Sequence, residues 1–164
     1  MIVDDDLGFR LGLSKVVKDE GFAVTGAGTL EQAREEIAVS LPDIVLVDLQ
    51  LPDGSGPDLL EDFEGTASPE VVLITANASV ETAVEALRRG AADYLTKPVD
   101  FARVKMALGN LTRTLQMKGE IGSLRTELRK LGRFGPLVGA SPAMQSIYDM
   151  TARVAKTNAS ITHR

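Results

Sequence analysis

The amino-acid sequence predicts an α/β protein, a doubly wound parallel sheet of five strands in the order 2-1-3-4-5 that is followed by an extended C-terminal helix. Short runs of branched apolar residues recur along the first hundred residues, helical patterns lie between them, and the two alternate five times. Because adjacent parallel strands need a crossover connection, this alternation favours a parallel sheet with helices on both faces.

The predicted strands are apolar runs that are too short for helices and rich in Val, Ile and Leu. Continuous runs of this kind are typical of strands that are buried on both faces. We expect strands at residues 2–3, 22–24, 44–47 and 71–74, and a weaker one at 94–95.

Helical patterns occupy the segments between these runs, at residues 7–20, 30–39, 58–63 and 80–89. Thr29 precedes the second segment and Gln32 follows three residues later, which is a helix-start signal, whereas Gly21 and Gly90 come just after the first and last segments and indicate helix ends.

Beyond residue 100 the pattern becomes that of a long helix with a heptad seam. The first turns, to about Leu111, are expected to cover the chain's own sheet, while the later turns have no sheet left to cover and predict a partner helix in a homodimer. We therefore expect a domain at 1–100 whose last helix begins near 101, a coiled-coil dimerisation helix at 101–132 and a further fragment at 133–164. The predicted dimer-helix residues are Leu108, Leu111, Leu115, Ile121, Leu124, Leu128 and Leu131.

Composition excludes several classes of protein. There is no cysteine, so disulfides and thiolate metal sites are excluded, and no apolar run approaches the roughly 20 residues that cross a bilayer. Residues 1–100 carry 7 Lys/Arg against 20 Asp/Glu, whereas residues 101–164 carry 11 against 3. The basic residues lie among leucines without interleaved aromatics, which favours a solvated helix face over nucleic-acid binding. We expect a cytoplasmic protein without membrane contact.

Carboxylates follow two strands that should be neighbours. Asp4, Asp5 and Asp6 come after the first strand and Asp48 after the third. In the order 2-1-3-4-5 these strands meet at the topological switch point, so Asp4, Asp5 and Asp48 should share one crevice. Clustered carboxylates are costly without a cation, and hard oxygen ligands suit Mg²⁺. The alternative is that Asp5 and Asp6 only cap the first helix.

The same edge should receive a hydroxyl and an ammonium group, since Thr75 ends the fourth strand and Lys97 follows the fifth. A carboxylate nucleophile, a divalent cation, a lysine and a hydroxyl are the groups that phosphoryl transfer needs. The sequence therefore predicts formation of an aspartyl phosphate on Asp48.

Four motifs, at residues 3–6, 47–56, 74–76 and 93–98, closely resemble those of receiver domains of two-component response regulators. The resemblance implies a flavodoxin-like or CheY-like fold in which Asp48 is the phosphoacceptor and a sensor histidine kinase is the donor. It also implies a Mg²⁺ site formed by Asp5, Asp48 and the backbone carbonyl of Gln50, with Asp4 holding the ion through water. The first strand is about two residues shorter than is usual in that family, which indicates either a natural start upstream or a trimmed sheet edge.

The family resemblance assigns further roles at the ends of the last two strands. Thr75 would bond a phosphoryl oxygen, Lys97 would pair with the phosphoryl group, and the inward or outward position of Tyr94 would report the switch. A cis peptide bond is expected at Lys97–Pro98, because only proline makes the cis form inexpensive.

The tail carries a second resemblance. Residues 134–148, which begin Phe-Gly-Pro-Leu-Val-Gly-Ala-Ser-Pro, look like the opening of the AAA+ ATPase domain of NtrC-like, sigma-54-dependent transcription activators. No Gly-x-x-x-x-Gly-Lys-Ser/Thr motif occurs, so this chain is not expected to hydrolyse ATP or to be an enzyme. We expect a truncated fragment with a vector-derived end, which does not itself bind nucleic acid. In the full-length protein the partners would include sigma-54 RNA polymerase and DNA.

The sequence thus predicts a receiver in which phosphorylation of Asp48 changes pairing along residues 101–131 and so controls an ATPase and transcription. One alternative is a degenerate receiver that acts only as an interaction module. An aspartyl-phosphate phosphatase would need a second acid where Gln50 stands, and a flavodoxin-like cofactor binder would need a neutral phosphate loop where the aspartates follow the first strand.

Overall fold

A computed structural model describes residues 1–63, 68–76, 79–130, 133–134, 137–138, 141 and 147. The chain divides into two compact units, Met1–Thr114 and Leu115–Arg164. The first unit contains the sheet and its covering helices. The second contains the end of the long helix and a short antiparallel hairpin of β8 (Arg133–Phe134) and β9 (Leu137–Val138). Apart from these elements, Ser141 and Ile147, the predicted ATPase fragment at 133–164 lies outside the described residues.

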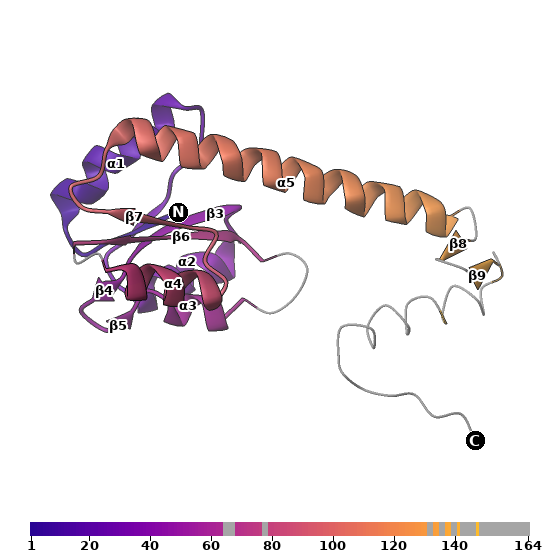
Figure 1. Ribbon diagram of the computed structural model, residues 1–164, viewed down its shortest axis with the longest axis horizontal. Helices are drawn as coiled ribbons and strands as arrows, with labels where there is room; N and C mark the ends of the chain where they lie inside the picture. Colours follow the sequence, from indigo (N-terminus) through magenta and orange to yellow (C-terminus); the bar gives the residue numbers. More distant parts are fainter. Residues whose placement is uncertain are drawn as a thin grey trace, which may run out of the picture. The chain divides into compact units, whose positions relative to one another are not determined.

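Five parallel strands form the sheet of the first unit in the order β2-β1-β3-β6-β7 (Figure 1), which confirms the predicted topology. The strands are β1 (Ile2–Val3), β2 (Gly26–Ala27), β3 (Ile44–Asp48), β6 (Glu70–Thr75) and β7 (Asp93–Thr96). After β3, a small antiparallel hairpin of β4 (Gln50–Leu51) and β5 (Gly54–Ser55) turns the chain toward the next helix.

Helices cover both faces of this sheet: α1 and the first turns of α5 lie on one side, and α2, α3 and α4 on the other (Figure 1). Side-chain caps fix where three of them begin, since Asp6, Thr29 and Ser79 each accept a hydrogen bond from a backbone N–H of the first turn. The helices are α1 (Leu7–Asp19), α2 (Leu30–Val39), α3 (Asp58–Glu61), α4 (Val80–Arg88) and α5 (Phe101–Lys130).

The core consists of two apolar layers, one on each face of the sheet. Successive side chains of a strand point to opposite faces, so Val45 and Val47 pack toward the α2–α4 side while Leu46 packs toward α1 and α5. All three are at most 2% exposed. The strand ends thus stay fixed by burial on both faces, which matters because they support the polar site.

The second predicted strand is wrong in position. Residues 22–24 form no strand, and β2 comprises Gly26–Ala27 instead. The parallel register explains the shift: Ile2 pairs with Gly26 and Val3 with Ala27, so β1 offers no residues opposite 22–24. An edge strand has one neighbour only, and its extent follows that neighbour more than its own apolar sequence. The other four strands and the helices lie within two residues of the predicted positions.

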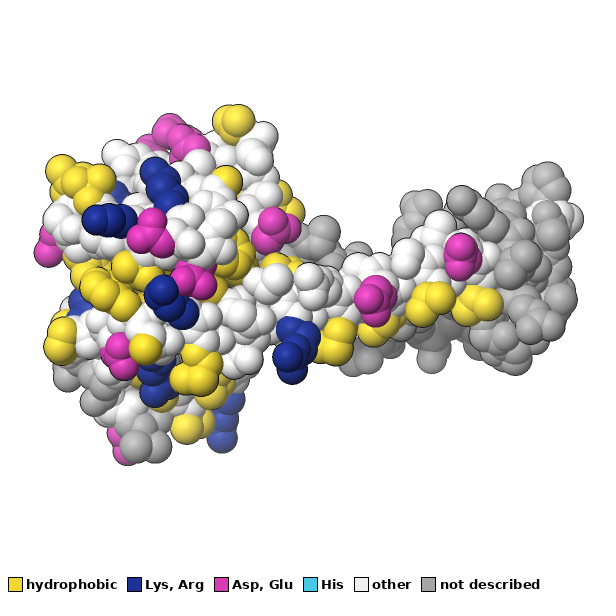
Figure 2. All heavy atoms as spheres, turned by 90° about the horizontal axis from the view of Figure 1, so that it is seen from above, with side chains coloured by type: hydrophobic (Ala, Val, Ile, Leu, Met, Phe, Trp, Pro, Cys, Tyr) yellow, Lys and Arg dark blue, Asp and Glu magenta, His cyan; other side chains and the backbone are white. Residues whose placement is uncertain are grey.

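The long helix begins at residue 101 as predicted, but the predicted dimer residues on it fall into two groups. Leu108 and Leu111 are only 2% and 6% exposed, because they pack in the core of the first unit; assigning them to a dimer seam was therefore wrong. Leu115 is half-buried, Ile121, Leu124 and Leu128 are exposed, and Leu131 lies outside the described residues. Figure 2 shows hydrophobic side chains in a row along this part of the helix.

Within the described part of the chain, none of the helices combines the length and apolar character that a membrane span requires. The peptide bond between Lys97 and Pro98 is cis, as expected.

Candidate functional site

Four strands deliver polar side chains to one edge of the sheet. Asp4 follows β1, Asp48 ends β3, Thr75 ends β6 and Lys97 follows β7. Asp4, Asp48 and Thr75 are only 1%, 8% and 3% exposed. Burying such groups is unfavourable unless they interact with one another, and this edge holds three of the four buried polar side chains among the described residues.

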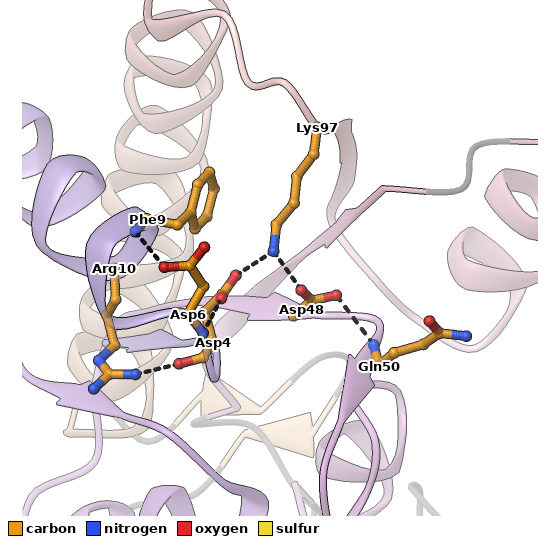
Figure 3. Close-up of polar contacts among 7 residues, drawn as sticks. All are labelled: Asp4, Asp6, Phe9, Arg10, Asp48, Gln50 and Lys97. Atoms are coloured by element: carbon orange, nitrogen blue, oxygen red, sulfur yellow. Dashed lines mark hydrogen bonds and ion pairs between the residues drawn. The ribbon is translucent and has the colours of Figure 1, made fainter.

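Lys97 joins the two buried carboxylates (Figure 3). Its Nζ atom lies 2.7 Å from Oδ2 of Asp4 and 2.5 Å from Oδ2 of Asp48. Burial of Lys97 acts to lower its pKa, but the hydrogen bonds and charges of the two carboxylates outweigh burial and raise the pKa of Lys97 above its ordinary value. The ammonium group is therefore charged at neutral pH and neutralises part of the acidic cluster.

Asp4 is held from several directions. Its Oδ1 atom accepts a hydrogen bond of 2.9 Å from the backbone N–H of Asp6, and the guanidinium group of Arg10 donates to its backbone carbonyl. Burial raises the pKa of Asp4, and the nearby Lys97 ammonium opposes that rise. The Oδ2 atom has the Lys97 ammonium group as its ion-pair partner, 2.7 Å away, and a carboxylate oxygen can accept from more than one group. A buried acceptor atom of Asp4 thus keeps the capacity to bind a further positive group.

Carboxylate oxygens of Asp4, Asp5 and Asp48 lie within 4.8 Å of one another, and Asp5 is the exposed member of the three. Three hard oxygen donors of this kind, one on the solvent side, fit the preference of Mg²⁺ for a few carboxylates together with its own waters. The buried Oδ2 atom of Asp4, which can accept a further group beside Lys97, agrees with that fit.

The loop after β3 supports Asp48 through the backbone. The N–H of Gln50 donates to Oδ1 of Asp48 over 3.1 Å, and the N–H of Leu49 donates to the carbonyl of Ile74 over 2.7 Å. Gly56 packs directly on this backbone, since a Cβ atom built there would lie 2.1 Å from the Asp48 carbonyl oxygen. Gly56 is a supporting residue that sequence reasoning missed, because its contact with Asp48 depends on how the β4–β5 hairpin folds back.

Asp53 is a second supporting residue that was missed. Its carboxylate accepts hydrogen bonds of 2.9 Å from the backbone N–H groups of both Leu30 and Glu31, in the first turn of α2. These two hydrogen bonds are the main reason why the pKa of Asp53 is lowered. The β4–β5 hairpin is thereby attached to the start of α2. In the sequence, Pro52 and Gly54 on either side of Asp53 indicate a turn but not the partner of its carboxylate.

Tyr94 takes the inward position on β7. It is 8% exposed, and its hydroxyl oxygen lies 3.3 Å from Oγ1 of Thr82 on α4. Lys97, three residues later, also donates its backbone N–H to the carbonyl of Thr75 over 2.7 Å. The end of β7 therefore connects the polar site to α4.

The structure brings together the predicted site residues Asp4, Asp5, Asp48, Thr75 and Lys97 at one edge, with the backbone of Gln50 beside Asp48. It also adds Phe9, whose ring centroid lies 4.4 Å from the Lys97 Nζ atom and which was not predicted.

Comparison with known proteins gives consistent matches. The family model of the response regulator receiver domain matches residues 1–109. Regulatory protein AtoC of Escherichia coli is 37% identical over 98% of this chain and 35% of its own length, and transcriptional regulatory protein ZraR of the same species is 34% identical over 98% and 36%. The chain thus spans about a third of the length of these curated relatives.

Solved structures give the same result. The receiver domain of NtrX from Brucella abortus is 29% identical with a TM-score of 0.63, covering 69% of this chain and 97% of that one. A longer structure of NtrX from Brucella abortus in complex with ATP is 32% identical with a TM-score of 0.69, covering 96% of this chain and 35% of that one.

Proposed function

Since this chain belongs to the response regulator receiver domain family, we propose that it is a phosphorylation switch in which Asp48 accepts a phosphoryl group from a sensor histidine kinase. The matches to regulators over 98% of the chain confirm the resemblance to NtrC-like regulators that the sequence predicted.

The observation that supports this proposal most strongly is the position of Lys97 between two buried carboxylates, 2.5 Å from Asp48 and 2.7 Å from Asp4. An oxygen of Asp48 would attack the phosphorus atom of a phosphohistidine, forming a P–O bond as the P–N bond breaks and leaving the electron pair on the imidazole. Negative charge then grows on the phosphoryl oxygens, beside the Lys97 ammonium and the Thr75 hydroxyl. A fixed positive group at that place lowers the barrier because it needs no reorganisation.

The carboxylates of Asp5 and Asp48 and the backbone carbonyl of Gln50 are the groups that would hold Mg²⁺, with Asp4 holding it through water. When bound, the ion supplies a second positive charge next to the phosphoryl oxygens. The residues of the chain provide the rest: Asp48 is held in place by the Gln50 N–H, and Asp4 by the N–H of Asp6.

The consequence of phosphorylation would pass to Tyr94. If Thr75 and Lys97 move toward the new phosphoryl group, the end of β7 moves with them, and the contact between Tyr94 and Thr82 on α4 changes. We propose that this rearrangement alters how two protomers pair along the exposed apolar side chains of α5, Ile121, Leu124 and Leu128, which we call the seam. In the whole protein, the change in pairing would control a sigma-54-dependent transcription-activating ATPase.

The phosphoacceptor is tested by intact mass after incubation with acetyl phosphate and Mg²⁺. We expect one phosphoryl group on the wild type and on Asp62→Asn, an exposed carboxylate that pairs with Arg34, and none on Asp48→Asn. If the wild type gains no phosphoryl group, the chain has the receiver fold but does not accept a phosphoryl group, and the result supports the alternative of an interaction module.

The dimer seam is tested by sedimentation of the same samples. Leu124 is 57% exposed, so Leu124→Glu should leave the fold intact while it weakens any dimer. Thr126→Glu is the matched control, because Thr126 is exposed on the same helix but off the seam, with its hydroxyl bonded to the Gly122 carbonyl. A monomer in both phosphorylation states of the wild type would contradict the proposal.

A further inference from the structure

Lys97 has a third neighbour besides its two carboxylates. The Phe9 ring lies against the ammonium group, with 4.4 Å between the Nζ atom and the ring centroid. In Figure 3 the ring comes from the start of α1 and lies beside the Lys97 ammonium group, which dashed lines join to Asp4 and Asp48. The lysine side chain is 20% exposed as a result.

Hydrogen bonds of the first turn of α1 hold the backbone of Phe9 in place. Its N–H donates to Oδ1 of Asp6, the N-cap of α1, over 3.0 Å. The next residue, Arg10, bonds the carbonyl of Asp4. The first turn of α1 is therefore attached to the acidic loop at two points, and the ring is presented to Lys97 by a rigid element.

An aromatic ring in this place acts on Lys97 in two ways. Its negative face attracts the ammonium group. It also restricts a four-carbon side chain that would otherwise sample many rotamers in solvent. Both effects keep the positive charge where Asp48 needs it before a phosphoryl group arrives, and preorganised charge of this kind is what accelerates transfer.

We propose that Phe9 is a positioning residue for phosphorylation of Asp48, acting through the ammonium group of Lys97. This inference rests on the proposed phosphoacceptor function. Cation–π contacts contribute about 0.5–2 kcal/mol, so loss of the aromatic face should slow phosphorylation by about 2- to 30-fold.

The test compares Phe9→Leu, which keeps an apolar side chain but no aromatic face, with Phe9→Tyr, which keeps the face. Leu11→Ala is the matched control, because Leu11 lies on the same helix and is 61% exposed. Two quantities are measured on each protein: the rate at which acetyl phosphate with Mg²⁺ phosphorylates Asp48, and the NMR shifts of the Lys97 Hε protons without phosphodonor.

We expect an upfield ring-current shift of the Lys97 Hε protons in the wild type, Phe9→Tyr and Leu11→Ala, and a wild-type rate in these three. Phe9→Leu should lose the shift and phosphorylate about 2- to 30-fold more slowly, with urea unfolding to confirm that it is folded. A wild-type rate in folded Phe9→Leu, or no ring-current shift in the wild type, would overturn the inference.

Failure of the proposed function would look different. If the wild type is not phosphorylated at all, both the phosphoacceptor proposal and the proposed effect of Phe9 on the phosphorylation rate are refuted, whatever the NMR shifts show. A slow rate in Phe9→Leu that Phe9→Tyr does not rescue would indicate a loss of size or packing at residue 9 and would also overturn the role of the aromatic face.

Discussion

Replacing Gly56 by alanine should destabilise the domain and disturb Asp48 together. A Cβ atom at residue 56 would lie 2.1 Å from the carbonyl oxygen of Asp48, 3.0 Å from its carbonyl carbon and 3.1 Å from Cγ2 of Val47. The nearest of these is a backbone atom at the end of a buried strand, so it cannot rotate away as a side chain could. The added methyl group can be accommodated only if the hairpin or β3 shifts.

The expected cost follows from what such a shift breaks. Overpacking a tight site costs about 1–3 kcal/mol. Here the shift also strains the hydrogen bonds from the Gly56 N–H to the carbonyl of Leu49, 3.0 Å, and from the Leu59 N–H to the carbonyl of Gly56, 3.1 Å. We therefore expect a loss of about 3 kcal/mol in the free energy of unfolding for Gly56→Ala, and slower phosphorylation of Asp48, because its backbone is displaced.

Gly12→Ala is the matched control. Residue 12 lies within α1, and a Cβ atom there would meet nothing within 4 Å, so alanine should stabilise by up to about 1 kcal/mol through helix propensity. Both substitutions restrict the unfolded chain equally, so the difference between them isolates the steric cost at residue 56. Urea unfolding followed by circular dichroism measures both free energies. If Gly56→Ala is as stable as Gly12→Ala, the reasoning is refuted.

Three further predictions concern other parts of the first unit. The amino group of Met1 donates to the carbonyl of Ile44, and burial lowers its pKa to about 6 from 8.0. The unfolded chain then binds more protons than the folded one between these values, so the free energy of unfolding should rise by up to about 2 kcal/mol from pH 6 to pH 8, and N-terminal acetylation should flatten this rise in urea titrations. Asp53→Ala removes the carboxylate that accepts from the first turn of α2 and should lower the urea concentration at the unfolding midpoint; an unchanged midpoint would contradict this. A double-mutant cycle of Tyr94→Phe and Thr82→Ala should give a coupling energy of about 0.5–1 kcal/mol if the two hydroxyls interact, and zero coupling would exclude it.

The central part of the fold could be predicted because its strands are buried on both faces. Residues 44–48 and 70–75 lie in the middle of the sheet, where burial selects continuous apolar runs that are visible in the sequence. The edge strand could not be placed, because the pairing of Ile2 with Gly26 decides its register. The sequence predicted that α5 stops covering the sheet at about Leu111, because the sheet is too short for a longer helix. The burial of each leucine depends on side-chain packing, which a heptad pattern does not specify.

The candidate site could be predicted as far as strand ends define it. Asp4 and Lys97 follow strands, and Asp48 ends one. The order of these strands brings their carboxyl ends together, so the sequence was sufficient to predict that the three side chains meet. Phe9 and Gly56 act through contacts with residues that are distant in the chain or across a turn. An aromatic residue in the first turn of a helix and a glycine in a loop are both common, so the sequence alone does not show that Phe9 contacts Lys97 or that Gly56 contacts the Asp48 backbone.

Charge balance at this edge would link the proposed Mg²⁺ site to the proposed phosphorylation of Asp48. The ammonium group of Lys97 is shared between Asp4 and Asp48, and it opposes the rise in the pKa of Asp4 that burial causes. Phosphorylation would replace the single negative charge of Asp48 by a group of charge about −2, as for other phosphorylated side chains near pH 7. Lys97 would then be drawn toward the phosphoryl oxygens, and Asp4 would lose part of its neutralising partner while it remains buried. A buried carboxylate that loses a neutralising partner is costly, so the proposed phosphorylated state would need a second cation beside Asp4 more than the unphosphorylated state would.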